Sequence, residues 1–205
     1  MKIDVFTQSA IKITAAKNIY FDPYQIKDKY HDADYIFITH DHYDHYDEDS
    51  IKNILKETTI VIIPECLEDR VKTITKNYIT VLPEKSYSVE DLSFETIPSY
   101  NNDKTFHPKE KLYVGYKVKI EDKYFYIMGD TDLTNEALKV KCDVCFVPIG
   151  GTYTMNVIEA ANYINTISPK LAVPIHYGSI VGDINLYEEF IKLINPSIKV
   201  EVYIK

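Results

Sequence analysis

Short stretches in which apolar and polar positions alternate dominate the first half of the chain. They are rich in β-branched and aromatic residues and end near turn-forming residues, which is typical of half-buried strands. The expected strands are 2–6, 11–14, 18–21, 35–39, 59–63, 78–82, 86–89 and 92–97. Apolar residues at helical spacing predict one helix capped by Asp47 and ending near Lys56. A second helix is expected to begin at Pro64, because the fixed φ of proline suits a first helical turn.

In the second half, strands and helices alternate. The expected strands are 113–120, 124–128, 144–148, 171–175 and 199–204. Helices are expected from Thr134, over a segment with apolar residues on one face from Val157 to Ile164, and near 185–193. The segment 98–111 is expected to be a loop of a length that is often functional. Hairpins followed by this alternation favour two sheets packed face to face, with helices outside.

The composition favours one core, because the 205 residues are 45% hydrophobic and 26% charged. We therefore expect a single domain, 1–205. No apolar stretch approaches the roughly 20 residues that span a membrane, and the first residues do not read as a signal peptide. Three cysteines are an odd number and are expected to be reduced thiols in a cytoplasmic protein. The oligomeric state stays open, a homo-oligomer included.

The net charge of −8 also bears on partners. No cluster of basic and aromatic residues would overcome its repulsion of a phosphate backbone. Nucleic acid is therefore a poor candidate, and a small-molecule substrate is expected.

Candidate chemistry concentrates in the segment His40-Asp41-His42-Tyr43-Asp44-His45, directly after the apolar strand expected at 35–39. In an extended segment, His40 and His42 point the same way and can share a metal ion, while the following turn can direct Asp44 and His45 to a second. Imidazole and carboxylate ligands suit zinc, iron, nickel or manganese. A merely solvated turn is a poor explanation for three histidines and two aspartates in six residues.

Thr39–His45 resembles the His-x-His-x-Asp-His motif of the metallo-β-lactamase-fold superfamily. Three other segments resemble parts of that family in the same order: Phe21-Asp22-Pro23, Gly129-Asp130-Thr131-Asp132 and Pro174-Ile175-His176-Tyr177-Gly178. Within that superfamily, Gln8-Ser9, the segment Pro148–Met155 and the His176-Tyr177-Gly178 ending are similar to the compact bacterial and archaeal branch that contains ascorbate-6-phosphate lactonase-like proteins. The resemblance implies an α/β (α+β) fold, a four-layered αββα sandwich.

The resemblance also implies two divalent metal ions, with zinc as the first choice and manganese, nickel or iron as alternatives. The implied ligands are His40 and His42 for one ion, Asp44, His45 and His176 for the other, and Asp130 as a bridge. Asp44 would also act in catalysis by orienting the attacking water. Asp22 would support the histidine segment through hydrogen bonds.

One departure from the family concerns the third histidine of the first metal site. The loop that should supply it reads Ile97-Pro98-Ser99-Tyr100-Asn101-Asn102. Water or Asn101 could complete the site, His107 from the same loop could do so, or one metal alone could bind tightly. His107 could equally be a proton donor, a substrate contact or a solvated loop residue. Lys104 and Lys109 could meet an anionic group on a substrate, or simply be exposed.

The resulting hypothesis is a metal-dependent hydrolase that uses activated water on a small ester, lactone or phosphodiester. A diiron redox protein and a catalytically weak metal-binding protein are alternatives with the same ligands. A nuclease is a weaker alternative, because the chain is acidic and lacks a basic clamping arm.

Overall fold

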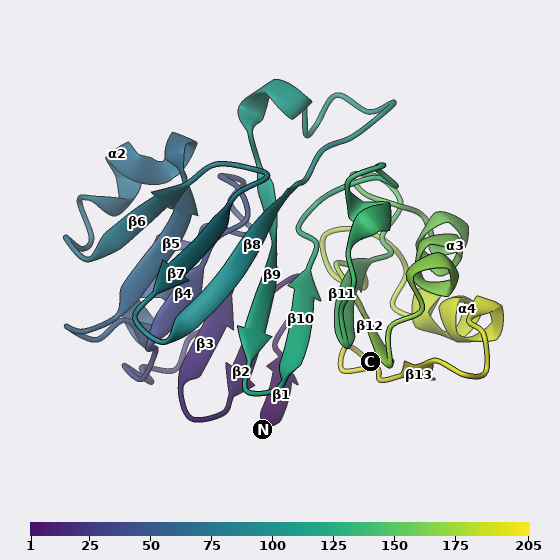
Figure 1. Cartoon of the computed structure of the whole chain (residues 1–205), viewed down its shortest axis with the longest axis horizontal. Coiled ribbons are helices and arrows are strands. Elements are labelled where there is room, and N and C mark those ends of the chain that lie inside the picture. Colours follow the sequence, from purple (N-terminus) through teal and green to yellow (C-terminus); the bar gives the residue numbers. More distant parts are fainter. The chain divides into compact units, whose positions relative to one another are not determined.

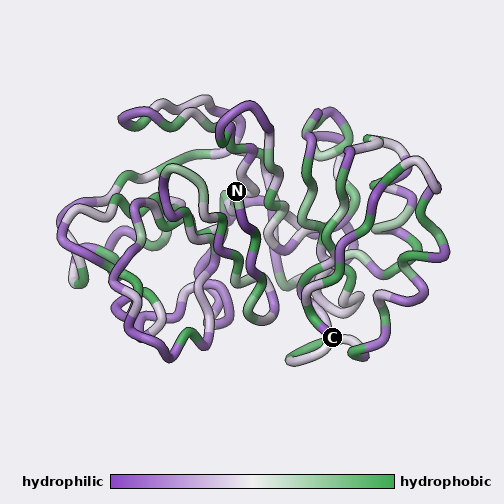
Figure 2. The backbone as a smooth tube through the Cα atoms, turned by 90° about the horizontal axis from the view of Figure 1, so that it is seen from below, coloured by the Kyte–Doolittle hydropathy of each residue, from purple (hydrophilic) through white to green (hydrophobic).

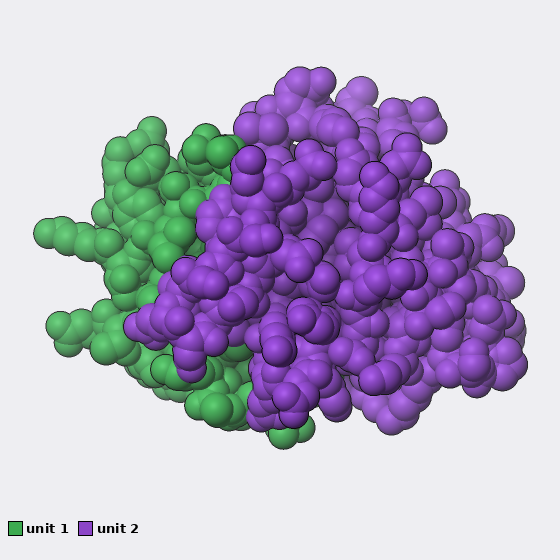
Figure 3. All heavy atoms as spheres, viewed as in Figure 1, with its two compact units in different colours: residues 1–82 green, residues 83–205 purple.

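The computed structural model describes all 205 residues. They divide into two compact units, residues 1–82 and 83–205, which Figure 3 shows in different colours. Each unit holds one β-sheet and a hydrophobic core of its own. The mixed α/β class with two sheets is confirmed, while the assignment of 1–205 to a single domain stays a prediction.

The first unit is built on a six-stranded sheet whose strands lie in sequence order. The strands are β1 (Lys2–Val5), β2 (Ile11–Thr14), β3 (Asn18–Phe21), β4 (Tyr35–Phe37), β5 (Ile60–Pro64) and β6 (Tyr78–Val81). The first three pair antiparallel, and β3 to β6 pair parallel. Strands β4 and β5 are buried along their whole length, which explains their unbroken apolar sequences.

Helices connect the last three parallel strands of this unit, β4 to β6. Helix α1 (Glu48–Ile54) begins at the predicted cap, since the Asp47 carboxylate accepts from the main-chain N–H groups of Asp49 and Ser50. The helix expected from Pro64 is shorter and starts later. Pro64 ends β5, and a 3₁₀ turn, η1 (Glu65–Leu67), precedes α2 (Glu68–Val71).

The second unit has a seven-stranded sheet in the order β13-β12-β11-β10-β9-β8-β7. The strands are β7 (Ser86–Val89), β8 (Leu92–Pro98), β9 (Val114–Ile120), β10 (Lys123–Ile127), β11 (Val144–Pro148), β12 (Leu171–Ile175) and β13 (Lys199–Val200). Strands β7 to β10 form an antiparallel meander, and β10 to β13 are parallel. Helices α3 (Val157–Ile167) and α4 (Leu186–Leu193) pack together beside β11 and β12 (Figure 1).

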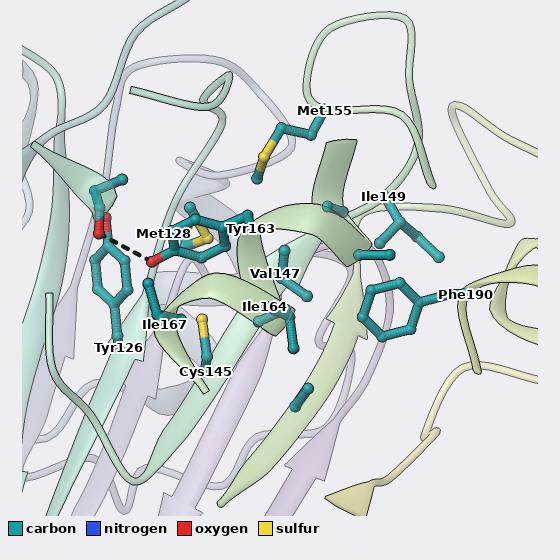
Figure 4. Close-up of a cluster of buried hydrophobic side chains, with 14 of the residues drawn as sticks. Tyr126, Met128, Cys145, Val147, Ile149, Met155, Tyr163, Ile164, Ile167 and Phe190 are labelled. Carbon is teal, nitrogen blue, oxygen red and sulfur yellow. Dashed lines mark hydrogen bonds between the residues drawn. The ribbon is translucent and has the colours of Figure 1, made fainter. Parts of the chain in front are cut away.

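The core of the second unit lies between this sheet and the two helices (Figure 4). Val147 and Ile149 from the β11 region, Ile164 from α3 and Phe190 from α4 are all buried there. The buried Tyr163 hydroxyl donates to the carbonyl oxygen of Ala137 at 3.2 Å, so its polar atom is satisfied. Along the tube in Figure 2, hydrophobic and hydrophilic residues alternate at short intervals, as the strand pattern requires.

Two predicted elements of the second unit are wrong in extent. In place of a helix from Thr134 there is a 3₁₀ turn, η3 (Ala137–Lys139), because after the bond from Leu138 N–H to the Thr134 carbonyl the pattern changes to i→i+3. The last strand, β13, has two residues rather than six. Pro174 of β12 lacks the N–H that would pair on that side of the sheet, where Ala172 accepts from Glu201 N–H, so the ladder stops.

In the second unit, the loop between β8 and β9 contains another 3₁₀ turn, η2 (Lys109–Lys111). No helix in either unit combines the length and apolar character needed to cross a bilayer. None of the three cysteines forms a disulfide.

Candidate metal centre

In the first unit, the candidate ligands follow β4, at the carboxyl end of a parallel strand where functional residues commonly lie in such sheets. The turn is closed by hydrogen bonds from His45 N–H and Tyr46 N–H to the carbonyl oxygen of His42, at 3.1 and 2.8 Å. His40, Asp44 and His45 are buried. Their burial excludes a solvated polar turn.

These side chains are close enough to share metal ions. The His40 ring centroid lies 4.6 Å from that of His42 and 3.9 Å from that of His45. The His45 Nε2 and Asp44 Oδ2 atoms are 3.7 Å apart. Two ligand atoms of a tetrahedral zinc ion lie about 3.4 Å apart, given bonds of about 2.1 Å. Asp44 and His45 are therefore spaced as two ligands of one ion.

Asp22 and Thr39 determine which ring nitrogen of these histidines is available. Asp22 Oδ1 accepts from Thr39 N–H at 2.8 Å, and Oδ2 accepts from His45 Nδ1 and Thr39 Oγ1, each at 2.7 Å. Because the Thr39 hydroxyl gives its only hydrogen to Asp22, it accepts from His40 Nδ1 at 2.9 Å. In both neutral rings the hydrogen is on Nδ1, so the lone pair is on Nε2 and can bind a metal ion.

Gln8 is a residue of this set to which the sequence assigned no role. Its side-chain amide donates to Asp44 Oδ2 at 3.4 Å, and the residue is completely buried. The signal that could have found it is a polar Gln8-Ser9 pair between two apolar strands. Gln8 and Asp22 both have left-handed backbones, with φ of 49° and 43°, a conformation that costs energy and is concentrated at functional sites.

In the second unit, Asp130 follows β10 and His176 follows β12, again at the carboxyl ends of parallel strands, with β11 between them in the sheet. His176 Nε2 lies 3.1 Å from Asp130 Oδ2, and His107 Nε2 lies 3.5 Å from the same oxygen. All three side chains are buried. One carboxylate oxygen thus has two imidazole nitrogens at the separation expected for ligands of a common ion.

His176 depends on the close approach of another segment. Its φ is 57°, also left-handed. A Cβ atom on Gly150, in the segment after β11, would lie 2.3 Å from the His176 carbonyl oxygen. Glycine at position 150 is therefore required for this approach.

The loop after β8 is bound to the segment that carries Asp130. Ser99 Oγ donates to the Asp130 carbonyl at 2.9 Å, Tyr100 N–H donates to Thr131 Oγ1 at 3.2 Å, and Asp132 N–H donates to the Tyr100 carbonyl at 2.9 Å. These bonds hold the loop that contains Asn101 and His107 in place beside Asp130.

The two lysines of this loop are paired within their own unit. Lys104 forms an ion pair with Asp132, and Lys109 Nζ lies 2.8 Å from Glu136 Oε1. The hydrogen bond from Lys109 holds the pKa of Glu136 below its usual range. Both lysines therefore already have carboxylate partners.

The residue types offered by the two units fit a divalent metal ion. The candidate ligands are His40, His42, Asp44, His45, His107, Asp130 and His176. Histidine rings that donate their second nitrogen to a neighbouring oxygen are the usual form of such ligands. The set has no cysteine. It therefore suits metals that bind through imidazole and carboxylate ligands, namely zinc, manganese, iron or nickel, better than metals that bind through thiolates.

Comparison with known proteins agrees with this chemistry. Residues 2–176 match the family model described as "Beta-lactamase superfamily domain". A UPF0173 protein of Pyrococcus abyssi is 31% identical over 173 residues, covering 82% of this chain and 79% of the relative. A UPF0173 metal-dependent hydrolase of Staphylothermus marinus is 32% identical over 181 residues, covering 83% and 74%.

Solved structures give the same fold. A Parabacteroides distasonis protein to which a metal-dependent hydrolase activity is ascribed superposes with a TM-score of 0.86 at 27% identity, covering 99% of this chain and 93% of the other. A metallo hydrolase of Ignicoccus hospitalis gives 0.78 at 21% identity, covering 98% and 93%. The chain therefore belongs to the β-lactamase superfamily, with the metallo-β-lactamase fold, and within it to the UPF0173 family.

Proposed function

We propose that this chain uses a binuclear metal centre to hydrolyse a small ester or lactone, or a phosphodiester. The protein is a metal-dependent hydrolase of the metallo-β-lactamase fold, in line with its relatives. The observation that carries the metal-site proposal is the hydrogen bonding of the rings. Asp22 and Thr39 leave Nε2 of His45 and His40 as the lone-pair atoms, which neither a surface turn nor a salt bridge requires.

In this proposal His40 and His42 would hold one ion, Asp44, His45 and His176 would hold the other, and Asp130 would serve both. Bound divalent ions can lower the pKa of water to about 7 and stabilise developing negative charge. Asp44 would also orient the attacking water, and the Gln8 side-chain amide holds Asp44 by a hydrogen bond. Asp22 keeps the histidine rings in the metal-binding tautomer.

Zinc is our first choice of metal, because nitrogen and carboxylate ligands suit it and it needs no redox partner. Lys104 and Lys109 already have carboxylate partners, which favours an uncharged ester or lactone over an anionic substrate. The net charge of −8 disfavours nucleic acid. The absence of disulfides suits the reducing cytoplasm, which we infer as the compartment.

Metal analysis combined with a substrate panel tests this proposal. The purified protein is analysed for metals, stripped with chelator, reloaded with zinc, manganese, nickel or iron, and assayed on chromogenic esters, lactones and phosphodiesters. We expect about two ions per chain and turnover only after reloading. His42→Asn should abolish turnover, whereas the matched variant His31→Asn, at an exposed histidine outside the cluster, should not. Full turnover by the stripped protein would refute the proposal.

A further inference from the structure

Phe106, in the loop after β8, is the exception among the phenylalanines of the second unit, because its side chain is 46% exposed. The other phenylalanines of this unit are all buried, namely Phe94, Phe125, Phe146 and Phe190. A single exposed apolar residue is common on a protein surface and needs no explanation. Phe106, however, belongs to an aromatic pair and directly precedes His107, a buried candidate ligand.

The partner of Phe106 in this pair is Tyr153, from the segment after β11. The two ring centroids are 4.7 Å apart and the ring planes meet at 89°, which is an edge-to-face contact. Aromatic rings prefer this arrangement, because the positive edge of one ring meets the negative face of the other. Tyr153 is itself only partly buried. The two rings therefore form a partly exposed aromatic surface, which we call the Phe106–Tyr153 pair.

Hydrogen bonds from Asn101 join the two segments that carry these rings. On one side, Asn101 Oδ1 accepts from the His107 main-chain N–H at 3.1 Å, and Asn101 N–H donates to the His107 carbonyl at 2.8 Å. On the other side, Asn101 Nδ2 donates to the Tyr153 carbonyl at 2.9 Å. The rings are therefore held in place before any ligand binds, which lowers the cost of binding one.

The Tyr153 segment is also joined to the segment that carries Asp130. Two residues after Tyr153, Met155 N–H donates to the Thr131 carbonyl at 3.2 Å. Asp130 directly precedes Thr131, and its Oδ2 atom lies 3.5 Å from His107 Nε2. Both rings of the pair are thus attached by main-chain bonds to residues beside candidate ligands.

The lysines of the same loop leave this surface uncharged. Lys104 forms an ion pair with Asp132, and Lys109 Nζ lies 2.8 Å from Glu136 Oε1. An anionic group would have to compete with these carboxylates for the lysines, whereas an uncharged ring would meet an aromatic surface that is already exposed. The residues around Phe106 therefore favour an aryl group over an anion.

We infer that the Phe106–Tyr153 pair binds an aryl group of the substrate, which makes aryl-bearing esters or lactones the preferred substrates. The inference rests on the hydrolysis proposed above and names its substrate class. A ring-on-ring contact favours an aryl group by about 2- to 10-fold, beyond the effect of the apolar area that any group of that size would bury. Phe106 and Tyr153 are then residues that determine specificity.

Binding of three hydroxamic acids tests this inference, since a hydroxamate binds a metal ion through its oxygen atoms and carries a side group that can be varied. Acetohydroxamate, cyclohexylpropanohydroxamate and phenylpropanohydroxamate are titrated into the zinc-loaded protein by calorimetry. We expect the phenyl compound to bind at least about 10-fold more tightly than acetohydroxamate, because it buries apolar area. It should also bind about 2- to 10-fold more tightly than the cyclohexyl compound, because only an aryl ring makes ring-on-ring contacts.

Variants of Phe106 show whether these preferences come from the aromatic pair. Phe106→Ala should lose most of the advantage of the phenyl compound over acetohydroxamate. Phe106→Leu keeps an apolar side chain, so it should lose only the preference for phenyl over cyclohexyl. Tyr124→Ala is the matched control, because it truncates an exposed aromatic residue near the start of β10 in the same unit, and it should leave all three affinities unchanged. Equal affinity of the wild type for the phenyl and cyclohexyl compounds would overturn the inference, and so would an undiminished phenyl preference in Phe106→Ala.

A second measurement requires neither metal nor turnover. Benzyl alcohol, titrated into chelator-stripped, ¹⁵N-labelled protein, should shift the amide NMR signals of Phe106 and Tyr153 but not that of Tyr124. In Phe106→Ala the shift at Tyr153 should be reduced, and thermal melting shows whether the variant is folded. The absence of shifts at both positions in the wild type would overturn the inference.

These readouts are independent of the proposed hydrolysis. A phenyl preference that depends on Phe106, alongside inactivity on every substrate, would contradict the proposed function alone. Metal-dependent turnover of esters or lactones, alongside equal affinity for the phenyl and cyclohexyl compounds, would contradict this inference alone.

Discussion

Asp22 offers the sharpest test of how the first unit prepares its ligands. Its carboxylate accepts three hydrogen bonds, from Thr39 N–H, Thr39 Oγ1 and His45 Nδ1, in a completely buried position. Asp22→Ala removes all three acceptors. Asp22→Asn keeps the size of the side chain but replaces one acceptor with a donor. The two variants therefore separate the effect on stability from the effect on the metal site.

In Asp22→Ala, the Thr39 hydroxyl can turn to another partner, but the Thr39 N–H and the His45 ring N–H are left without an acceptor. Each unsatisfied buried group costs about 1–3 kcal/mol, or roughly 2–6 kcal/mol together. The left-handed backbone at position 22, with φ of 43°, adds about 1 kcal/mol for alanine. Since the free energy of unfolding of a domain is about 5–15 kcal/mol, the metal-stripped Asp22→Ala protein should lose a large part of its stability.

In Asp22→Asn, the left-handed backbone is tolerated. If the amide oxygen serves Thr39 N–H, the NH₂ group faces His45 Nδ1 and forces that nitrogen to accept. The ring hydrogen then moves to Nε2, the atom that should bind metal. If the amide turns over, its NH₂ group faces Thr39 N–H instead. In both orientations, we expect the free energy of unfolding to fall by about 1–2 kcal/mol and the metal affinity to fall by about 10- to 100-fold.

Urea unfolding of the stripped proteins gives the free energies of unfolding, and Zn²⁺ titration gives the affinities. Asp28→Asn, at an exposed aspartate of the same unit, is the control and should match the wild type in both. Wild-type zinc affinity in Asp22→Asn would refute the tautomer argument. A decrease of less than about 1 kcal/mol in the free energy of unfolding of Asp22→Ala would refute the expected cost of leaving buried donors without acceptors.

Three further predictions concern the second unit. Gly150→Ala should lower both the melting temperature and the metal affinity, measured by calorimetry and titration, because its Cβ would collide with the His176 carbonyl. Asn156→Ala should cost about 1 kcal/mol in urea unfolding through loss of the α3 capping box, with zinc affinity unchanged. The pKa of Glu136 is lowered by Lys109, so this pair stabilises the folded state above the unfolded pKa, and the contribution is lost as pH falls through the folded pKa. The stability difference between wild type and Glu136→Gln should therefore be largest near neutral pH and shrink on acidification, whereas a difference independent of pH would contradict it.

Most strands could be predicted from the sequence because their alternation is local. The segments 11–14, 18–21 and 171–175 coincide with β2, β3 and β12. The helix expected from Thr134 could not be judged that way, since a 3₁₀ turn and a short helix share the same spacing over one turn. The early end of β13 depends on a proline in a different strand, which no local pattern of residues 199–204 contains.

Candidate ligands could be read from the sequence where the chain concentrates them, as in His40–His45, or where strand ends mark them, as at Asp130 and His176. The contacts of the Asn101 side-chain oxygen with the main-chain N–H and Nδ1 of His107 could not be predicted, because they depend on how a loop closes over six residues. Gln8 was missed for a related reason. Its partner Asp44 is 36 positions away, and a glutamine in a turn has no distinctive spacing.

Three residues close to the proposed chemistry, Gln8, Asp22 and His176, adopt a backbone conformation that glycine would adopt without strain. At about 1–3 kcal/mol each, they lower the stability of the fold for the sake of side-chain placement. Position 22 is the exception, because the buried donors of Thr39 and His45 need its carboxylate. Selection in the laboratory for heat resistance alone should therefore enrich glycine or asparagine at positions 8 and 176, and catalysis would be lost as thermal stability rose. A mutational scan that scores abundance and turnover separately would show the two rankings opposed at these positions and in agreement across most of the core.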